Sequence, residues 1–323
     1  MKAAVINELG QAPRYLDFPD PVPANDQQVV IRVLAASVKN LDKGRADGSH
    51  YARHTNLPEV VGIDGVGELP DGSRVYATAI SGMIAEKALI DKNRYSVVPG
   101  ELDNVTAAAL PNAVMGAALA LKSRGGLEAG QTVLINGATG VTGQAAVQIA
   151  RHYGAKHIIA TGRNPESLKL LQELGADEVI SLTQDDKMII EQVKKINGHT
   201  HIDLVIDYTW GHPAELLLEA LKGGGIHGMT TPTRYVTVGG MAGDNITLSS
   251  SILRSSAIEL IGSGIGSLPR EAMVDFQRNI LPEMFDLAAT GKLKLEIVTA
   301  SLADVEEAWI RHIPAGKRLV IVI

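Results

Sequence analysis

The chain has 323 residues, of which 45% are hydrophobic and 33 are glycine, and its 30 lysines and arginines against 36 aspartates and glutamates give a formal net charge of −6. This length favours about two domains, and the hydrophobic content supplies packed cores and argues against a disordered chain. The lack of cysteine excludes disulfides, thiolate catalysis and sulfur-bound zinc, and the mildly acidic charge without basic clusters argues against nucleic-acid binding.

The first hundred residues predict an irregular β domain. Short apolar runs alternate there with proline, glycine and aspartate, which is the pattern of strands separated by turns. Asp71-Gly72 between two such runs predicts a tight hairpin. The predicted strands are 3–6, 29–34, 60–66, 74–79 and 88–90.

From Gly130 the pattern changes to strands that alternate with amphipathic helices. Such alternation implies right-handed crossovers and a parallel sheet. The predicted strands are 132–135, 157–161, 178–181, 202–207, 235–238, 258–261 and 318–323, and the predicted helices are 142–153, 165–174, 186–196, 213–221 and 269–289.

We therefore predict an α/β protein in which a doubly wound Rossmann domain, residues 121–265, is inserted in a β-rich domain made of residues 1–120 and 266–323. The apolar run 107–121 is interrupted by Pro111-Asn112, and the apolar run after Met1 is too short for a signal peptide. We expect no membrane span, and a chain without cysteine suits the reducing cytoplasm.

The sharpest local motif is an A-x-G-x-x-G turn formed by Ala138, Gly140 and Gly143 directly after a predicted strand. In dinucleotide-binding folds the first small residue permits a tight turn, the second lets the backbone approach a pyrophosphate, and the third lets the helix pack on the strand. The amides of Val141 and Thr142, at the helix start, are then expected to donate to the phosphates. The alternative is a glycine-rich turn that serves packing alone.

The end of the second strand predicts which nucleotide binds. An NAD site usually places a carboxylate there for the ribose 2′-hydroxyl, whereas this chain has Gly162, Arg163 and Asn164. A guanidinium can hold a 2′-phosphate bidentately, and a carboxylate would repel it. The sequence therefore favours NADPH over NADH as cofactor, with a solvated loop cation as the alternative for Arg163.

Several motifs together resemble the zinc-independent quinone oxidoreductase (zeta-crystallin-like) branch of the medium-chain dehydrogenase/reductase superfamily. They are the A-x-G-x-x-G turn and the segments 36–42, 61–67, 108–111, 207–211, 262–266 and 315–318. The resemblance spans nearly the whole chain. It implies a GroES-like catalytic domain, a Rossmann domain and usually a homodimer.

The same resemblance bears on metal chemistry. Zinc-dependent relatives carry a cysteine where this chain has Lys39 and a His-Glu pair where it has Ile63 and Asp64. We therefore expect no metal and no Lewis acid, which disfavours alcohol oxidation. The remaining candidate substrates are compounds that accept hydride readily without a metal, such as quinones and α,β-unsaturated carbonyls.

Three residues are candidates for catalysis. Tyr51 aligns with a tyrosine that lines the quinone pocket in the resembling family, and it is the first choice for a hydrogen-bond donor to substrate; the alternative is a half-buried loop aromatic. Lys39 stands where the family commonly has asparagine beside the nicotinamide. It is either a cationic partner for oxyanion charge or a surface lysine. Asp42 orients Lys39 or a cofactor ribose, or is an ordinary turn aspartate.

The remaining candidates are residues expected to bind the cofactor. Tyr208, Gly239, Gly240 and Gly264 follow later strands and would frame the nicotinamide, because open parallel sheets bind ligands at the carboxyl ends of their strands. Ordinary loop glycines are the alternative. Arg318 resembles an arginine that contacts the pyrophosphate in the superfamily, with a strand-edge cation as the alternative.

The predicted function is NADPH-dependent hydride transfer to a quinone or a related electrophilic carbonyl acceptor without zinc. The alternatives are an alkenal or enone double-bond reductase and a non-catalytic NADPH-binding sensor, the latter because Lys39 replaces asparagine. The expected partner is a small molecule, with neither nucleic acid nor membrane. A homodimer is expected to join through the apolar strand near residues 258–260.

Overall fold

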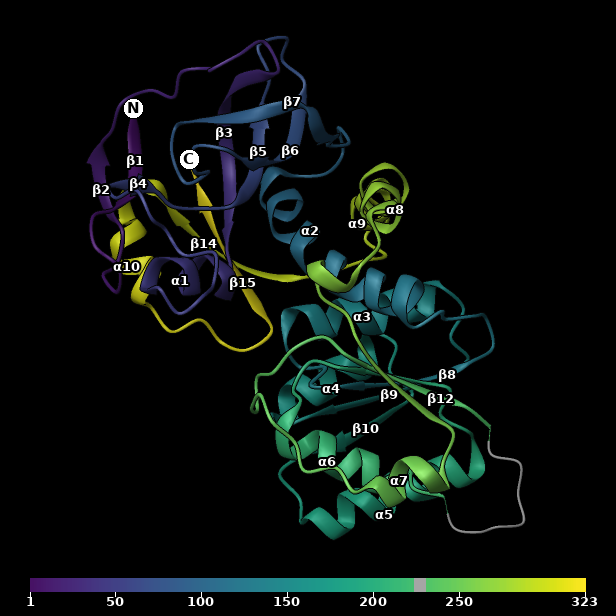
Figure 1. Ribbon diagram of the computed structural model, residues 1–323. Helices are drawn as coiled ribbons and strands as arrows, with labels where there is room; N and C mark the ends of the chain where they lie inside the picture. The colour runs from purple at the N-terminus through teal and green to yellow at the C-terminus, as the bar shows by residue number, and fades with distance from the viewer. Residues whose placement is uncertain (224–230) are drawn as a thin grey trace. The chain divides into compact units, whose positions relative to one another are not determined.

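The computed structural model describes residues 1–223 and 231–323. The chain divides into two compact units (Figure 1): unit 1 contains residues 1–111 and 277–323, and unit 2 contains residues 112–276. Both marked ends of the chain belong to unit 1. Unit 2 is therefore an insertion into unit 1.

Two sheets form unit 1. A three-stranded antiparallel sheet has the order β2-β1-β4, and a six-stranded sheet has the order β14-β15-β3-β5-β6-β7, which closes on itself through a pairing of β3 with β7. In the six-stranded sheet β15 runs antiparallel to β3, with Leu319 opposite Val38. The strands are β1 Lys2–Ile6, β2 Arg14–Asp17, β3 Gln28–Val38, β4 Glu59–Val60, β5 Asp64–Glu68, β6 Arg74–Ala79, β7 Lys87–Val97, β14 Glu296–Ser301 and β15 Lys317–Val322.

The predicted strand 60–66 is in fact two strands in different sheets. The backbone bends at Gly62, whose φ is +98°, and a Cβ there would lie 2.6 Å from Cγ1 of Ile84. Only glycine fits this bend without strain. The bend sends β4 to the small sheet and β5 to the large one.

A long apolar helix, α2 (Asn104–Ala118), continues as a π-helical turn over Leu119–Arg124 and contains the boundary between the units. It runs through Pro111, where the sequence predicted an interruption; a proline inside a helix removes one backbone hydrogen bond but leaves the rest of the helix. By length and composition Asn104–Arg124 could cross a membrane, and 67% of its apolar window is buried inside the protein, as in a core helix.

Unit 2 holds a parallel sheet of six strands in the order β10-β9-β8-β11-β12-β13. Numbered along the chain this order is 3-2-1-4-5-6, and the direction of strand addition reverses between β8 and β11. The predicted α/β class, with a Rossmann-type sheet beside a strand-rich domain, is confirmed. The strands are β8 Thr132–Asn136, β9 His157–Gly162, β10 Glu178–Ser181, β11 Leu204–Asp207, β12 Thr233–Thr237 and β13 Ile258–Gly262.

The helices complete both units. The predicted helix 269–289 is interrupted by a π-helical turn over Phe276–Ile280, next to the point where the chain passes from unit 2 back to unit 1. The helices are α1 Asn40–Asp47, α3 Val141–His152, α4 Pro165–Glu173, α5 Asp186–His199, α6 Gly211–Ala220, α7 Ser250–Ser255, α8 Arg270–Asp275, α9 Leu281–Ala289 and α10 Val305–Ile310.

Candidate functional site

The turn between β8 and α3 is shaped by three small residues. A Cβ at Gly143 would lie 2.5 Å from Cα of Ala138, so the helix can pack on the strand only with glycine there. The Ala138 amide donates to the Thr161 carbonyl at 2.8 Å, which ties the turn to β9. At Gly140 the nearest atom to a Cβ is the Gly137 carbonyl oxygen at 4.0 Å, so this place stands open.

Helix α3 begins at this open place. Gly140 is its N-cap, and Val141 and Thr142 form its first turn. The first amides of a helix have no partner within the helix, and the helix dipole adds positive charge there. An open cradle at the start of a helix fits the pyrophosphate of a dinucleotide.

The carboxyl end of β9 borders the same turn. A Cβ at Gly162 would lie 2.2 Å from Cγ2 of Thr139, so glycine is required where the strand passes the turn. Arg163 follows on the surface, and within residues 1–223 and 231–323 it makes no ion pair or hydrogen bond. Asn164 caps α4, its side-chain oxygen accepting from the Ser167 amide at 2.9 Å, which leaves the side-chain nitrogen for a ligand. This edge therefore presents a guanidinium and no carboxylate.

A buried polar network crosses four neighbouring strands at the point where the strand order reverses. Thr161 on β9 donates its hydroxyl to Oδ1 of Asn136 on β8 at 2.6 Å, and Nδ2 of Asn136 donates to Oδ1 of Asp207 on β11 at 2.9 Å. Tyr235 on β12 donates its hydroxyl to Oδ2 of Asp207 at 2.7 Å. All four residues are completely buried. Burial, followed by the negative charge of Asp207, raises the pKa of Tyr235 well above its ordinary value.

This network was not among the features predicted from the sequence. Its signal was available in the pattern, because Asn136 and Asp207 each end an apolar strand with a polar residue and lie opposite one another in the register of β8 and β11. A polar residue that repeats at the carboxyl ends of parallel strands indicates a site at that edge.

The loops after β11, β12 and β13 carry the other cofactor candidates of unit 2. The Tyr208 hydroxyl donates to the Gly116 carbonyl at 3.3 Å, and burial raises the pKa of this phenol, which therefore stays protonated. A Cβ at Gly239 would lie 2.8 Å from the Tyr208 carbonyl oxygen, and one at Gly240 would lie 3.0 Å from Oδ1 of Asp244. At Gly264 no atom lies within 4 Å of such a Cβ. The structure thus brings the candidates of unit 2 to one edge of the sheet.

In unit 1, Lys39 is a buried ion-pair centre. Its side chain is 2% exposed, and Nζ lies 2.8 Å from Oδ1 of Asp64 and 3.2 Å from Oδ2 of Asp42. Nζ also donates to the carbonyl and hydroxyl oxygens of Ser37, at 3.1 and 3.2 Å. Burial alone would lower the pKa of Lys39, but Asp42 and Asp64 outweigh it and raise the pKa above its ordinary value. The alternative of a surface lysine is therefore wrong.

Asp42 and Arg318 belong to the same cluster. Asp42 accepts from the amides of Lys39 and Ile63, both at 2.9 Å, so it fixes the start of α1 and the chain before β5. Arg318 is 9% exposed on β15, an inner strand of its sheet, which excludes a strand-edge cation. Burial lowers the pKa of Arg318, and the charges of Asp64 and Asp42 oppose that shift. Its contact with a pyrophosphate stays a prediction.

Tyr51 lies apart from the ion-pair cluster. It is 90% exposed, so it is not the half-buried aromatic of the alternative, and its ring lies 4.2 Å from the ring of His50. Its role as a donor to substrate stays a prediction.

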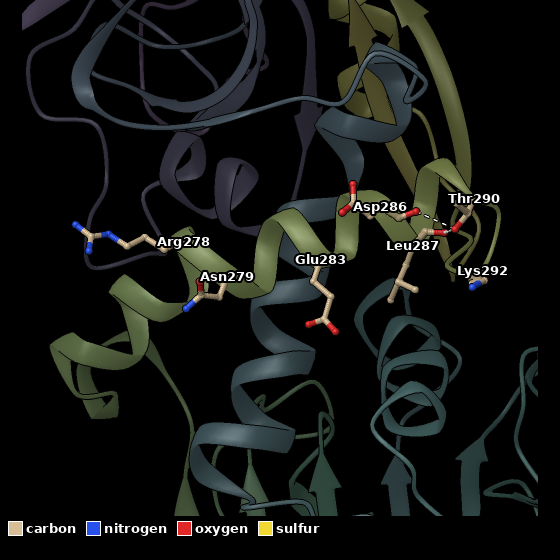
Figure 2. Close-up of a pocket in the computed structure, with 7 residues that line it drawn as sticks. All are labelled: Arg278, Asn279, Glu283, Asp286, Leu287, Thr290 and Lys292. Carbon is tan, nitrogen blue, oxygen red and sulfur yellow. Dashed lines mark hydrogen bonds between the residues drawn. The ribbon is translucent and has the colours of Figure 1, made fainter.

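A shallow pocket elsewhere in unit 1 lies along the π-helical turn, α9 and the residues that follow it, and Figure 2 shows the side chains that line it. The Thr290 hydroxyl donates to the Asp286 carbonyl at 2.8 Å. The lining mixes acidic, basic and amide groups, which is typical of a solvated helix face. The lining residues are Arg278, Asn279, Glu283, Asp286, Leu287, Thr290 and Lys292.

Comparisons with known proteins bear on the whole chain. Residues 141–287 match the family described as zinc-binding dehydrogenase. The probable NADPH-dependent quinone reductase tdiC of Emericella nidulans is 28% identical over 96% of both chains. The quinone oxidoreductase of Rattus norvegicus is 30% identical over 85% of this chain and 84% of its own.

The chain is also similar to an enoyl reductase and to a solved quinone oxidoreductase structure. The mitochondrial enoyl-[acyl-carrier-protein] reductase of Arabidopsis thaliana is 28% identical over 91% of this chain and 80% of its own. The quinone oxidoreductase of Thermus thermophilus, solved also in its complex with NADPH, is 26% identical with a TM-score of 0.77, and the alignment covers all of both chains.

Proposed function

Because the chain belongs to the quinone oxidoreductase branch of the medium-chain dehydrogenase/reductase superfamily, we propose that it is an NADPH-dependent reductase that passes hydride to a quinone or related electrophilic carbonyl without zinc. The recognition of this family from sequence motifs is confirmed, and with it the assignment to the oxidoreductases.

One observation carries the choice of cofactor: the carboxyl end of β9 has an exposed Arg163 and no carboxylate, directly beside the open cradle at Gly140. When bound, NADPH supplies the hydride. The cradle and the first amides of α3 hold the pyrophosphate, and Arg163 with the Asn164 amide nitrogen holds the 2′-phosphate. The relatives named for NADPH support this choice.

The residues at the zinc position do not fit a metal. Lys39 places an ammonium within 2.8 and 3.2 Å of the two nearest carboxylates, and an ammonium has no lone pair to offer a cation. Among the described residues, no group of three His, Cys, Asp or Glu side chains is arranged to bind a metal ion. This donor set supports our proposal of a zinc-independent reaction.

Lys39 acts in this proposal as a fixed charge. The three protons of its ammonium already have acceptors on Asp64 and Ser37, so a direct bond to a substrate oxyanion would require one of them to be given up. Asp42 holds Lys39 in place, and Tyr51 is the proposed donor to the acceptor oxygen.

The second candidate function is reduction of an activated carbon–carbon double bond. The similarity to an enoyl reductase over most of both chains favours it. The two functions share the cofactor and differ in the atom that accepts the hydride.

Stopped-flow oxidation of NADPH by 1,4-benzoquinone and by trans-2-hexenal separates these functions, and binding without oxidation by either would indicate a sensor. We expect NADPH to be oxidised, with NADH much less effective. Arg163→Ala should raise the KM for NADPH about 10- to 100-fold, since a bond to a charged group is lost, and leave NADH unchanged. Lys194→Ala, an exposed cation on α5, is the control and should change neither value.

We further propose a homodimer joined through β13, because this strand is the edge of the six-stranded sheet in unit 2. Sedimentation of a monomer at micromolar concentration would end this proposal.

A further inference from the structure

Asp207 is a completely buried carboxylate that is held by hydrogen bonds and not by a cation. In the described part of the chain no lysine, arginine or histidine forms an ion pair with it. Besides Asn136 and Tyr235, it is bonded by its own loop: Oδ1 accepts from the Thr209 amide at 2.8 Å, the Thr209 hydroxyl at 2.9 Å and the Trp210 amide at 3.0 Å. Five donors therefore converge on this side chain, four on Oδ1 and one on Oδ2, and both oxygens serve as acceptors.

The loop that Asp207 holds is strained. Trp210 has φ +53°, and among residues 1–223 and 231–323 it is the only residue other than glycine with a positive φ. Gly211 follows with φ +57°, and a Cβ there would lie 2.7 Å from the Ala242 carbonyl oxygen. A bulky residue keeps such a backbone only where its surroundings impose it.

Two members of the network impose it. Asp207 binds the Trp210 amide, and the Tyr235 ring packs edge-on against the Trp210 ring, with centroids 6.4 Å apart at 69°. The backbone and the side chain of Trp210 are thus held by two residues that are bonded to one another.

The same loop touches the proposed cofactor site on two sides. Cγ2 of Thr209 lies 2.4 Å from where a Cβ of Gly137 would stand, so the loop packs directly against the phosphate turn. The Tyr208 carbonyl packs against Gly239 in the next loop. In a doubly wound sheet the two halves of a dinucleotide lie on opposite sides of the point where strand order reverses, and β11 to β13 lie on the side away from Arg163.

We propose that Asp207 is a positioning residue, whose carboxylate fixes the loop Tyr208–Gly211 in the conformation that receives the nicotinamide half of the cofactor. The statement about the nucleotide rests on the proposed function, whereas the statement about the loop does not. Asp207 acts through the loop and needs no contact with the cofactor.

Asp207→Asn tests this proposal, because it keeps the shape and removes the charge. The control is Thr233→Val, which removes another buried hydrogen bond of unit 2, from the Thr233 hydroxyl to the Ile202 carbonyl at 2.7 Å. Thr233 is the first residue of β12, at the end of the strand away from the loop 208–211. Both are made in a Trp309→Phe background, which leaves Trp210 as the sole tryptophan, since the chain has two. Trp210 emission is recorded without nucleotide, and binding is measured for NADPH and for adenosine 2′,5′-bisphosphate.

We expect Asp207→Asn to shift Trp210 emission, to weaken NADPH about tenfold and to slow hydride transfer at saturating NADPH, while adenosine 2′,5′-bisphosphate binding stays within about twofold. Thr233→Val should change none of these. Equal effects on the two nucleotides, or unchanged emission and NADPH affinity in Asp207→Asn, would overturn the proposal.

If Asp207→Asn does not fold, Tyr235→Phe removes one bond to the same carboxylate and is read by the same criteria. Because the emission measurement needs no nucleotide, it still reports on the loop if the wild-type protein binds no NADPH. That last result would overturn the proposed function and not the role of Asp207 in holding the loop.

Discussion

Replacing Lys39 with methionine is the sharpest test of the ion-pair cluster in unit 1. The change keeps most of the buried volume and removes the ammonium that pairs with Asp42 and Asp64, at a site where the lysine side chain is 2% exposed. Breaking a buried pair by removing one partner costs about 3–5 kcal/mol. With a urea m-value of about 2 kcal/mol/M, the unfolding midpoint should fall by roughly 1.5–2.5 M.

The assay is urea unfolding followed by the fluorescence of Trp309, which lies in the core of unit 1, in a Trp210→Phe background. The control is Lys43→Met on the same helix, because Lys43 is partly exposed and makes no ion pair among the described residues; its midpoint should move by less than about 0.3 M. Adding Asp64→Asn to Lys39→Met should restore part of the loss. Equal midpoints for the two lysine variants would refute the argument.

The sign of the pH dependence follows from the same cluster. Because the pKa of Lys39 is raised above its ordinary value of 10.5, its stabilisation is fully present below that value and is lost only as pH rises through the higher pKa of the folded state. The difference between wild type and Lys39→Met should therefore stay constant from about pH 6 to 9.

Three further predictions concern unit 2. Gly143→Ala should destabilise the protein by about 1–3 kcal/mol and weaken NADPH binding, because its Cβ would meet Cα of Ala138 at 2.5 Å. The control, measured alongside it by calorimetry, is Gly198→Ala; Gly198 is a helix glycine with open space around it, and its replacement should be neutral or slightly stabilising. Gly162→Ala should cost a similar amount, because its Cβ would meet the Thr139 methyl group at 2.2 Å. Thr139→Ser lacks that methyl group and should recover part of the loss; a double variant no more stable than Gly162→Ala would contradict this contact. The hydrogen bond to Glu215, with a smaller effect from Asp186, raises the pKa of His212 above its ordinary value of 6.5. The small stabilisation that charged His212 gives is therefore present below pH 6.5 and is lost as pH rises through the raised pKa. Titration by NMR should show the raised pKa, and Glu215→Gln should reduce the shift.

The parallel sheet and its phosphate turn could be predicted from sequence because each depends on neighbours in the chain. Apolar strands alternate with amphipathic helices, and the motif from Ala138 to Gly143 lies wholly within one strand–helix junction. Local patterns of this kind survive folding with little change.

The buried charges could not be predicted in this way. Lys39 lies in a polar segment that suits a surface, and its partner Asp64 is 25 positions away. Asn136 and Asp207 are 71 positions apart and meet only when β8 and β11 pair. The division of 60–66 into two strands likewise depends on Ile84, which blocks any side chain at Gly62. Each of these features is decided by tertiary contact.

The pairing of β15 with β3 sets an order for synthesis on the ribosome. Leu319 meets Val38 across roughly 280 positions of chain, so the larger sheet of unit 1 waits for a strand that is translated after the whole of unit 2. The inserted unit is continuous and can acquire its parallel sheet while the nascent chain is still growing. Until β15 is made, residues 35–38 of β3 lack their β15 partner, so this stretch of backbone is open to pairing with another chain during synthesis.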